Sequence, residues 1–153
     1  MHRGDVVPDF ELPDQTGTSR TLSGFLANGP VVLFFYPAAM TYGCTKESCH
    51  FRDLSAEFAA VGAQPVGISA DSVDKQMQFD EKESLGMPLL SDPDHTVAEQ
   101  LGAKRGASFL PNKRVTFVID SDRTLLGVFH SEFSMSSHAD KALELLKARR
   151  AAA

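Results

Sequence analysis

The fold of this chain is decided by Val31-Val32-Leu33-Phe34-Phe35-Tyr36-Pro37 and by the loop Ala38-Ala39-Met40-Thr41-Tyr42-Gly43-Cys44 that follows it. An unbroken apolar run is typical of a central strand covered on both faces, and a proline ends such a strand because it has no N–H to donate. Residues 44–61 then carry apolar side chains at spacings of three and four, which indicates a helix with one buried stripe. The stretch predicts a strand, a short loop and a helix that begins with a cysteine.

The composition is that of one globular domain spanning residues 1–153. The chain is 42% hydrophobic and has two cysteines, too few for the disulfide framework of a small secreted protein. No apolar run approaches the roughly 18 residues of a membrane span, and no apolar signal region follows the N-terminus. We therefore expect a cytoplasmic protein without a membrane partner. The net charge of −5 is spread along the chain, which argues against nucleic acid as a partner.

Strands and helices alternate along the rest of the chain. The expected elements are a hairpin at 9–18, a strand at 64–69, a helix from the cap Ser72 to about 84, an extended piece at 88–90, a short helix from 94 or 95 to 102, a hairpin of 115–120 with 125–130, and a helix at 137–150. This order predicts an α/β fold, with a mixed sheet flanked by helices and an N-terminal hairpin.

The position of Cys44 favours nucleophilic sulfur chemistry, because a helix N-terminus lowers a thiol's pKa from about 8.5 toward roughly 3.5 to 7.5. Cys49 follows five residues later. On a regular helix that spacing separates the Cα atoms by about 8.6 Å, whereas a disulfide needs roughly 4.4 to 6.8 Å. If both cysteines lie on one intact helix, a disulfide between them requires at least the first turn to unwind.

Other interpretations of the cysteines stay open at this point. Each can be a small buried hydrophobe, and with His50 the two form an incomplete zinc set whose spacing differs from the familiar C-x₂₋₄-C. A thioredoxin-like disulfide reductase would normally carry C-x-x-C, which this chain lacks. A redox-sensing or binding module would be oxidised once without turnover. The histidines are predicted as surface or capping residues rather than bases: His50, His95, His130 and His138.

The run Phe34-Phe35-Tyr36-Pro37-x-x-x-Thr41-x-x-Cys44-Thr45-x-Glu47-x-Cys49 resembles the active-site signature of peroxiredoxins. The second cysteine, five residues on, is similar to that of the Q-type or bacterioferritin-comigratory subgroup. Residues 4–14, 88–93 and 114–120 also resemble segments of this family, so the resemblance covers nearly the whole chain. It implies a thioredoxin-like fold and a thiol peroxidase that reduces hydrogen peroxide and organic hydroperoxides, without a metal or organic cofactor.

The resemblance also implies the roles of the two cysteines. Cys44 would attack the O–O bond and pass to a sulfenic acid, the reversible first stage of thiol oxidation. Cys49 would condense with it to an intramolecular disulfide. The reductant implied is thioredoxin, with glutaredoxin or another dithiol as alternatives, and we expect a monomer.

Four further residues are candidates for the site. Thr41 would place its hydroxyl on the peroxide, or would only bond its own turn. Arg114 would stabilise thiolate and oxyanion, or would be an exposed charge at a strand start. Pro37 would end the strand and shield the pocket from water. Glu47 is expected in the first helical turn, where a carboxylate suits the helix dipole, and in the family this position helps to order the site.

The chain departs from the usual subgroup pattern in two places. Ala38-Ala39 stands where a Lys-Asp pair is common, and Tyr42 where proline precedes Gly-Cys. Loss of that proline frees φ at Tyr42, so we expect activity with a changed rate. An apolar rim for the substrate is predicted from four residues: Met40, Phe109, Leu110 and Phe133.

Overall fold

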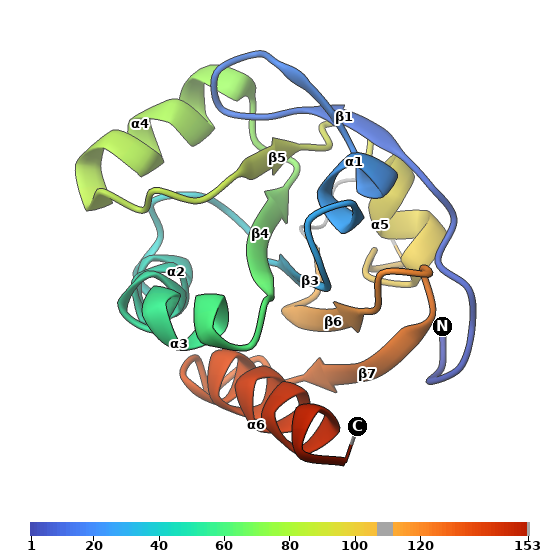
Figure 1. Ribbon diagram of the computed structural model, residues 1–153. Helices are drawn as coiled ribbons and strands as arrows, with labels where there is room; N and C mark the ends of the chain where they lie inside the picture. Colours follow the sequence, from blue (N-terminus) through green and yellow to red (C-terminus); the bar gives the residue numbers. More distant parts are fainter. Residues whose placement is uncertain (107–111, 153) are drawn as a thin grey trace.

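The computed structural model describes residues 1–106 and 112–152. A five-stranded mixed sheet runs through it in the order β5-β4-β3-β6-β7 (Figure 1). The central strand β3 (Val31–Phe35) pairs in parallel with β4 (Gln64–Ser69) and antiparallel with β6 (Val115–Ile119). The outer strands are β5 (Leu89–Ser91) and β7 (Leu125–His130). The predicted mixed α/β architecture is confirmed.

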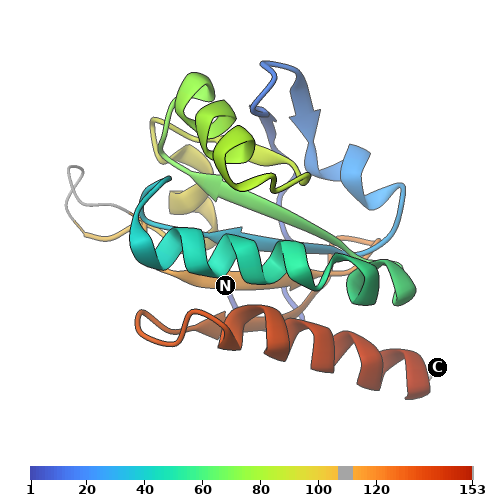
Figure 2. The same cartoon turned by 90° about the vertical axis from the view of Figure 1, so that its left-hand side faces the viewer.

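The helices cover both faces of the sheet. Helices α2, α3, α4 and α6 lie on one face of the sheet, and α1 and α5 lie on the other (Figures 1 and 2). The bounds are α1 (Leu22–Leu26), α2 (Tyr42–Asp53), α3 (Ser55–Ala60), α4 (Val73–Glu83), α5 (Thr96–Leu101) and α6 (Ser137–Ala152). The N-terminal hairpin, predicted at 9–18, is formed by β1 (Glu11–Pro13) and β2 (Ser19–Thr21), so its second strand begins just after the predicted range. In the described part of the chain, no helix combines the length and apolar composition that a membrane crossing requires.

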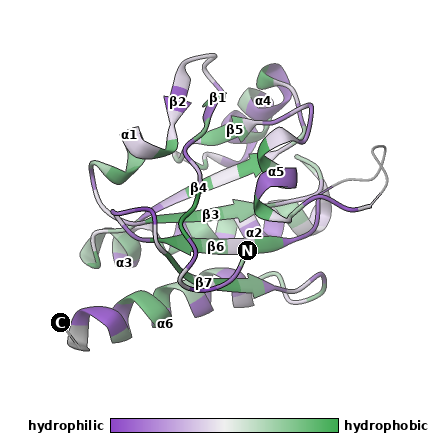
Figure 3. Ribbon diagram, turned by 90° about the vertical axis from the view of Figure 1, so that its right-hand side faces the viewer, coloured by the Kyte–Doolittle hydropathy of each residue, from purple (hydrophilic) through white to green (hydrophobic). Residues whose placement is uncertain are grey.

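Strand β3 is buried on both faces, as its apolar run predicts. Successive side chains point to opposite faces, so Leu33 and Phe35 join the core under α1 and α5, while Phe34 joins the core under α2 and α6. The Phe34 ring stacks on Phe51 of α2 with 4.2 Å between ring centroids. Figure 3 shows the apolar character of the central strands. This packing fixes α2 directly above the strand that precedes it.

The register of β3 and β6 brings two segments that are distant in sequence together at one end of these strands. Phe35, the last residue of β3, pairs with Val115, the first residue of the antiparallel strand β6. The loop that leaves β3 therefore lies beside Arg114, although Cys44 and Arg114 are 70 residues apart in sequence.

The helix predicted at 44–61 differs from the observed one. It begins two residues earlier, at Tyr42, and is divided into α2 and α3 by Leu54, whose ψ of 12° leaves the helical range. Glu47 therefore lies in the second turn, and the first turn of α2 has no acidic residue, so the first-turn placement of Glu47 is wrong. The short α1 was not predicted; Thr21 Oγ1 caps it by accepting from Gly24 N–H at 3.0 Å.

Candidate active site

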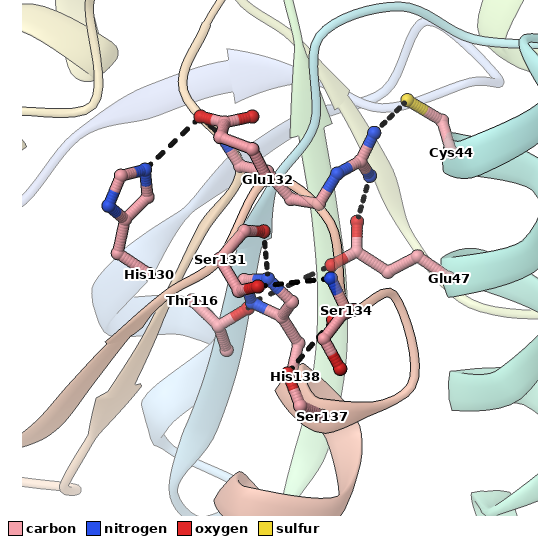
Figure 4. Close-up of polar contacts among 10 residues, drawn as sticks. Cys44, Glu47, Thr116, His130, Ser131, Glu132, Ser134, Ser137 and His138 are labelled. Carbon is pink, nitrogen blue, oxygen red and sulfur yellow. Dashed lines mark hydrogen bonds and ion pairs between the residues drawn. The ribbon is translucent and has the colours of Figure 1, made fainter.

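Cys44 lies in the first turn of α2 and is completely buried as a free thiol. Thr41, with φ −83° and ψ 158°, is the extended residue before the helix. Arg114 Nη2 donates a hydrogen bond to Cys44 Sγ at 3.3 Å (Figure 4). A buried guanidinium in contact with sulfur favours the thiolate, and it can also stabilise negative charge that forms on a leaving oxygen.

Arg114 immediately precedes β6 and is only 5% exposed, so it is not a surface charge. Its Nη1 donates to Glu47 Oε1 at 2.8 Å, and its backbone N–H donates to Glu132 Oε1 at 3.1 Å. Burial alone would lower the pKa of Arg114, but the adjacent Cys44 and Glu47 raise it above its usual value. The guanidinium is thus a fixed cation held between a sulfur and a carboxylate.

Glu47 has no exposed surface, so it is part of the site rather than a solvent-facing helix cap. Burial raises the pKa of Glu47 to about 7, while Arg114 opposes that rise. Its Oε1 accepts from Arg114. Its Oε2 has no hydrogen-bond partner among the described residues and lies 3.7 Å from His138 Nδ1.

The prediction that His138 is a surface or capping residue is wrong, because its side chain is completely buried. His138 is the second residue of α6, four residues before the buried Ala142 and eight before the buried Leu146. It therefore lies on the stripe of α6 that faces the sheet, and this spacing is the sequence signal that was missed. The other three histidines are confirmed outside the site: His50 and His130 are partly exposed, and His95 is the N-cap of α5.

The loop between β3 and α2 is anchored from outside. Ala39 N–H donates to Asp71 Oδ2 at 2.7 Å, a contact that sequence reasoning missed because Asp71 lies 32 residues away. Met40 has φ +64°, in the left-handed region that a non-glycine residue seldom adopts. Pro37 is half-buried at the end of β3. The loop is therefore held in a defined shape without the proline that usually precedes Gly43.

Thr41 is exposed, and its Oγ1 donates to Ala38 O at 2.8 Å. The hydroxyl hydrogen is thus used within the loop, as the turn interpretation expects. The oxygen lone pairs can still accept a hydrogen bond from a ligand.

The absence of a side chain at Gly43 leaves room for the side chains of Arg114 and Met135. A Cβ at this position would lie 3.2 Å from both Arg114 Nη2 and Met135 Cε. Sequence reasoning missed this role of Gly43 and the contact with Met135. Of the predicted apolar rim, Phe133 is 95% exposed and Met40 is half-buried. Phe109 and Leu110 lie outside the described residues.

Cys49 is half-buried on the same helix as Cys44, and both are free thiols. Its Sγ donates to Glu83 Oε2 at 3.6 Å, and burial raises the pKa of Cys49. Arg52 Nη1 also donates to the carbonyl oxygen of Glu83, so α2 is attached to the end of α4 beside Cys49. No group of three His, Cys, Asp or Glu side chains in the described segments is arranged to hold a metal ion.

Residues 3–127 match the AhpC/TSA family. A crystal structure of peroxidoxin BcpB from Mycobacterium tuberculosis is 63% identical, with a TM-score of 0.94 over 97% of each chain. Peroxiredoxin Bcp of Escherichia coli is 42% identical over 96% of each chain. A structure of the Xanthomonas campestris bacterioferritin comigratory protein, described in terms of alkyl peroxide reduction, is 30% identical with a TM-score of 0.84, covering 92% of this chain and 91% of that one.

Proposed function

This chain belongs to the AhpC/TSA family and is a peroxiredoxin, a thiol peroxidase with a thioredoxin-like fold; from that premise we propose that Cys44 is the cysteine that attacks the hydroperoxide. The observation that carries this assignment is the hydrogen bond from Arg114 Nη2 to the buried Cys44 Sγ, 3.3 Å long. Cys49 makes its hydrogen bond to a carboxylate instead, which disfavours its thiolate.

In the proposed reaction the Cys44 thiolate attacks the terminal oxygen of the hydroperoxide, and the O–O bond breaks. The hydroxyl stays on sulfur as a sulfenic acid, and the other oxygen leaves as an alkoxide or hydroxide that takes up one proton. Arg114 stabilises the negative charge on sulfur before the attack and on oxygen during it. Thr41 can accept a hydrogen bond from the peroxide O–H, and Pro37 shields the sulfur from water.

We propose that Cys49 then condenses with the sulfenic acid, which forms a disulfide and releases water. Both cysteines lie on α2, where about 8.6 Å separates Cα atoms five residues apart on a regular helix, so the segment between them must unwind. The contact of Cys49 with Glu83 must also break. Thioredoxin or a similar dithiol protein would reduce the disulfide, and the helix would form again.

We further propose that the chain forms a single domain, is a monomer and is located in the cytoplasm. A single domain is supported by one sheet whose strands span residues 31–130. A monomer is supported by one chain supplying both reacting cysteines, and a cytoplasmic location by a cysteine count too low for the disulfide framework of a small secreted protein.

Intact mass and thiol counts before and after one equivalent of hydrogen peroxide test the assignment. Wild type should lose two hydrogens and recover both thiols with thioredoxin and its reductase. Cys49→Ser should gain one oxygen, on Cys44, and lose thioredoxin-dependent turnover. Cys44→Ser should consume no peroxide.

Each single variant is the control for the other, because the chain has two cysteines. Slow oxidation of wild type with both thiols intact would contradict the assignment of Cys44. Oxidation that stops at one equivalent, with no recovery by any dithiol protein, would instead indicate a redox-sensing module. Normal thioredoxin-dependent cycling of Cys49→Ser would remove Cys49 from the reaction.

A further inference from the structure

A buried imidazole lies behind the ion pair of Arg114 and Glu47. His138, at the start of α6, lies between Thr116 of β6 and Glu47 of α2 (Figure 4). Its Nδ1 is 2.8 Å from Thr116 Oγ1 and 3.7 Å from Glu47 Oε2, and its Nε2 is 2.8 Å from the carbonyl oxygen of Ser131. All three side chains of this cluster are inaccessible to solvent.

The hydrogen bonds decide where the imidazole hydrogen resides. A backbone carbonyl can only accept, so His138 Nε2 carries a hydrogen toward Ser131. In the neutral ring Nδ1 then has a lone pair, which accepts the Thr116 hydroxyl hydrogen. The same edge of the ring faces Glu47 Oε2, which has no other partner in the described structure. Two hydrogen-bond acceptors, His138 Nδ1 and Glu47 Oε2, therefore face each other. One added proton would let one of them donate a hydrogen bond to the other.

We propose that Glu47 and His138 hold one proton between them while Cys44 is a thiolate, and release it when Cys44 is oxidised. This inference rests on the proposed role of Cys44 as the reacting thiolate. The proton resides on Glu47 Oε2 or on His138 Nδ1, and the two residues are called the Glu47–His138 pair below.

The charge count of the buried cluster favours this linkage. With Cys44 as a thiolate, the charges of Arg114, Glu47 and Cys44 sum to −1 without the proton and to zero with it. After oxidation the sulfur is neutral, and the sum is zero without the proton and +1 with it. Because an uncompensated charge is costly away from water, each state of Cys44 favours the protonation that makes the cluster neutral.

The acid–base properties of the two groups are compatible with exchange near neutral pH. Burial raises the pKa of Glu47 to about 7, and burial lowers the pKa of His138 below its usual value. Burial thus strengthens proton binding by Glu47 and weakens it at His138, and since the two groups are adjacent, the titration belongs to the pair rather than to either residue.

Other charged groups face the pair but do not change with the state of Cys44. Glu132, in the segment after β7, binds Arg105 and His130 and raises the pKa of Glu47. Arg114 and His130 both lower the pKa of His138. On the outer side of α2 and α6, His50 and Asp140 pair at 2.7 Å between Nε2 and Oδ1. The one charge near the pair that the reaction removes is that of Cys44.

The proton also balances the reaction. A thiolate and a hydroperoxide give a sulfenic acid and an alkoxide, which needs one proton to leave as an alcohol. Release of one proton by the Glu47–His138 pair matches that demand, so the first step needs no net proton uptake from solvent. Thiolate, hydroperoxide and the proton of the pair together give sulfenic acid and alcohol, so the step is balanced. The cluster of Arg114, Glu47 and Cys44 is neutral before and after it.

The test follows the proton directly and does not depend on turnover. Nitrogen NMR of His138 reports which ring nitrogens carry hydrogen, and infrared spectroscopy reports the protonated carboxyl of Glu47, with Glu47→Gln to assign that band. Both kinds of spectra are recorded from pH 5 to 9 in the reduced wild type and in Cys44→Ser. The serine hydroxyl of this variant stays uncharged and so removes the charge of the thiolate. We expect the pair to bind its proton about tenfold more tightly in wild type, from the attraction of one nearby charge.

Two variants separate this role from simple packing. His138→Gln keeps hydrogen-bonding groups but cannot titrate, and should change the pH profile of Cys44 oxidation in Cys49→Ser protein and lower its rate about tenfold, the scale on which supporting residues act. His50→Gln, which removes a histidine between the same two helices, should leave the profile unchanged. If His138→Gln does not fold, Thr116→Val removes the hydroxyl partner of Nδ1 and should shift the titration of the pair.

The outcomes distinguish this inference from the proposed function. Equal proton affinity in wild type and Cys44→Ser, or reduced wild type with no proton on Glu47 Oε2 or His138 Nδ1 at any point from pH 5 to 9, overturns the inference while Cys44 keeps its role. Peroxidase activity in Cys44→Ser would overturn the proposed function whatever the titration shows. A tighter proton in wild type together with an inactive Cys44→Ser supports both.

Discussion

Replacing Glu47 with glutamine should remove a large pH dependence from the stability of this protein. Glu47 is completely buried, and its pKa rises from an ordinary 4.5 to about 7 in the folded protein. A carboxyl whose pKa is raised by folding binds its proton more tightly in the native state. Its contribution is therefore fully present below pH 4.5 and is lost as the pH rises through about 7. Between pH 5 and 8 the loss amounts to about 2 to 3 kcal/mol.

Urea unfolding followed by circular dichroism, at intervals from pH 5 to 8, measures this loss. The free energy of unfolding of wild type should fall about 2 to 3 kcal/mol further than that of Glu47→Gln over this range. The ion pair with Arg114 adds no separate pH dependence, because Arg114 stays charged throughout and its attraction is already included in the pKa of Glu47. The lowered pKa of His138 gives a slope of opposite sign, but His138 is present in both proteins.

Glu132→Gln is the matched control. Burial tends to raise the pKa of Glu132, but the Arg114 N–H and His130 lower it overall. Its stabilising contribution is present above about pH 4.5 and is lost only at lower pH, so this variant should fall nearly as far as wild type between pH 5 and 8, less only by the small part of the Glu47 pKa rise that Glu132 causes. Parallel curves for wild type and Glu47→Gln would refute the reasoning, because they would mean that Glu47 is ionised across the whole range.

Three further substitutions have defined outcomes. Gly43→Ala puts a methyl 3.2 Å from Arg114 Nη2, and we expect it to displace the guanidinium and slow peroxide reduction about tenfold or more. Stopped-flow kinetics measures this rate, and an unchanged rate would show that Arg114 can shift freely. Glu83→Gln should speed disulfide formation several-fold, followed by quenched mass spectrometry, because it removes a carboxylate that raises the pKa of Cys49. Gly67→Ala should destabilise the fold by about 1 to 3 kcal/mol in urea unfolding, since its Cβ would lie 2.9 Å from a core side chain; a smaller loss would mean that the core relaxes.

The central strand could be predicted from sequence because burial on both faces leaves an apolar run without periodicity. The division of the following helix could not. Its apolar stripe continues through Phe51, Leu54 and Phe58, so the spacing gives no sign of the break at Leu54. The short α1 was missed because five residues carry too little periodicity, although Thr21 caps it.

The candidate site was predictable by motif but not by geometry. Cys44 could be predicted from its position at a strand-to-helix junction, and Thr41 and Arg114 from the family resemblance, whereas the ion pair that buries Glu47 joins it to Arg114, 67 residues away. Asp71 carries no local signal, because its hydrogen bond to the loop joins segments 32 residues apart. His138 did carry a signal, the four-residue spacing to Ala142.

The antiparallel register of β3 and β6 has a consequence for how this protein can vary. Phe35 opposite Val115 determines that the loop of Cys44 and the start of β6 meet, whatever the length of chain that connects them. Insertions, deletions or a new pair of termini in the surface turn between α4 and β5 should thus leave the distance from Cys44 to Arg114 unchanged. A single residue inserted between Arg114 and Val115 would instead turn the guanidinium away from the sulfur, because neighbouring positions along a strand face opposite sides. Variation in length is tolerated where strands are joined and excluded where they are paired.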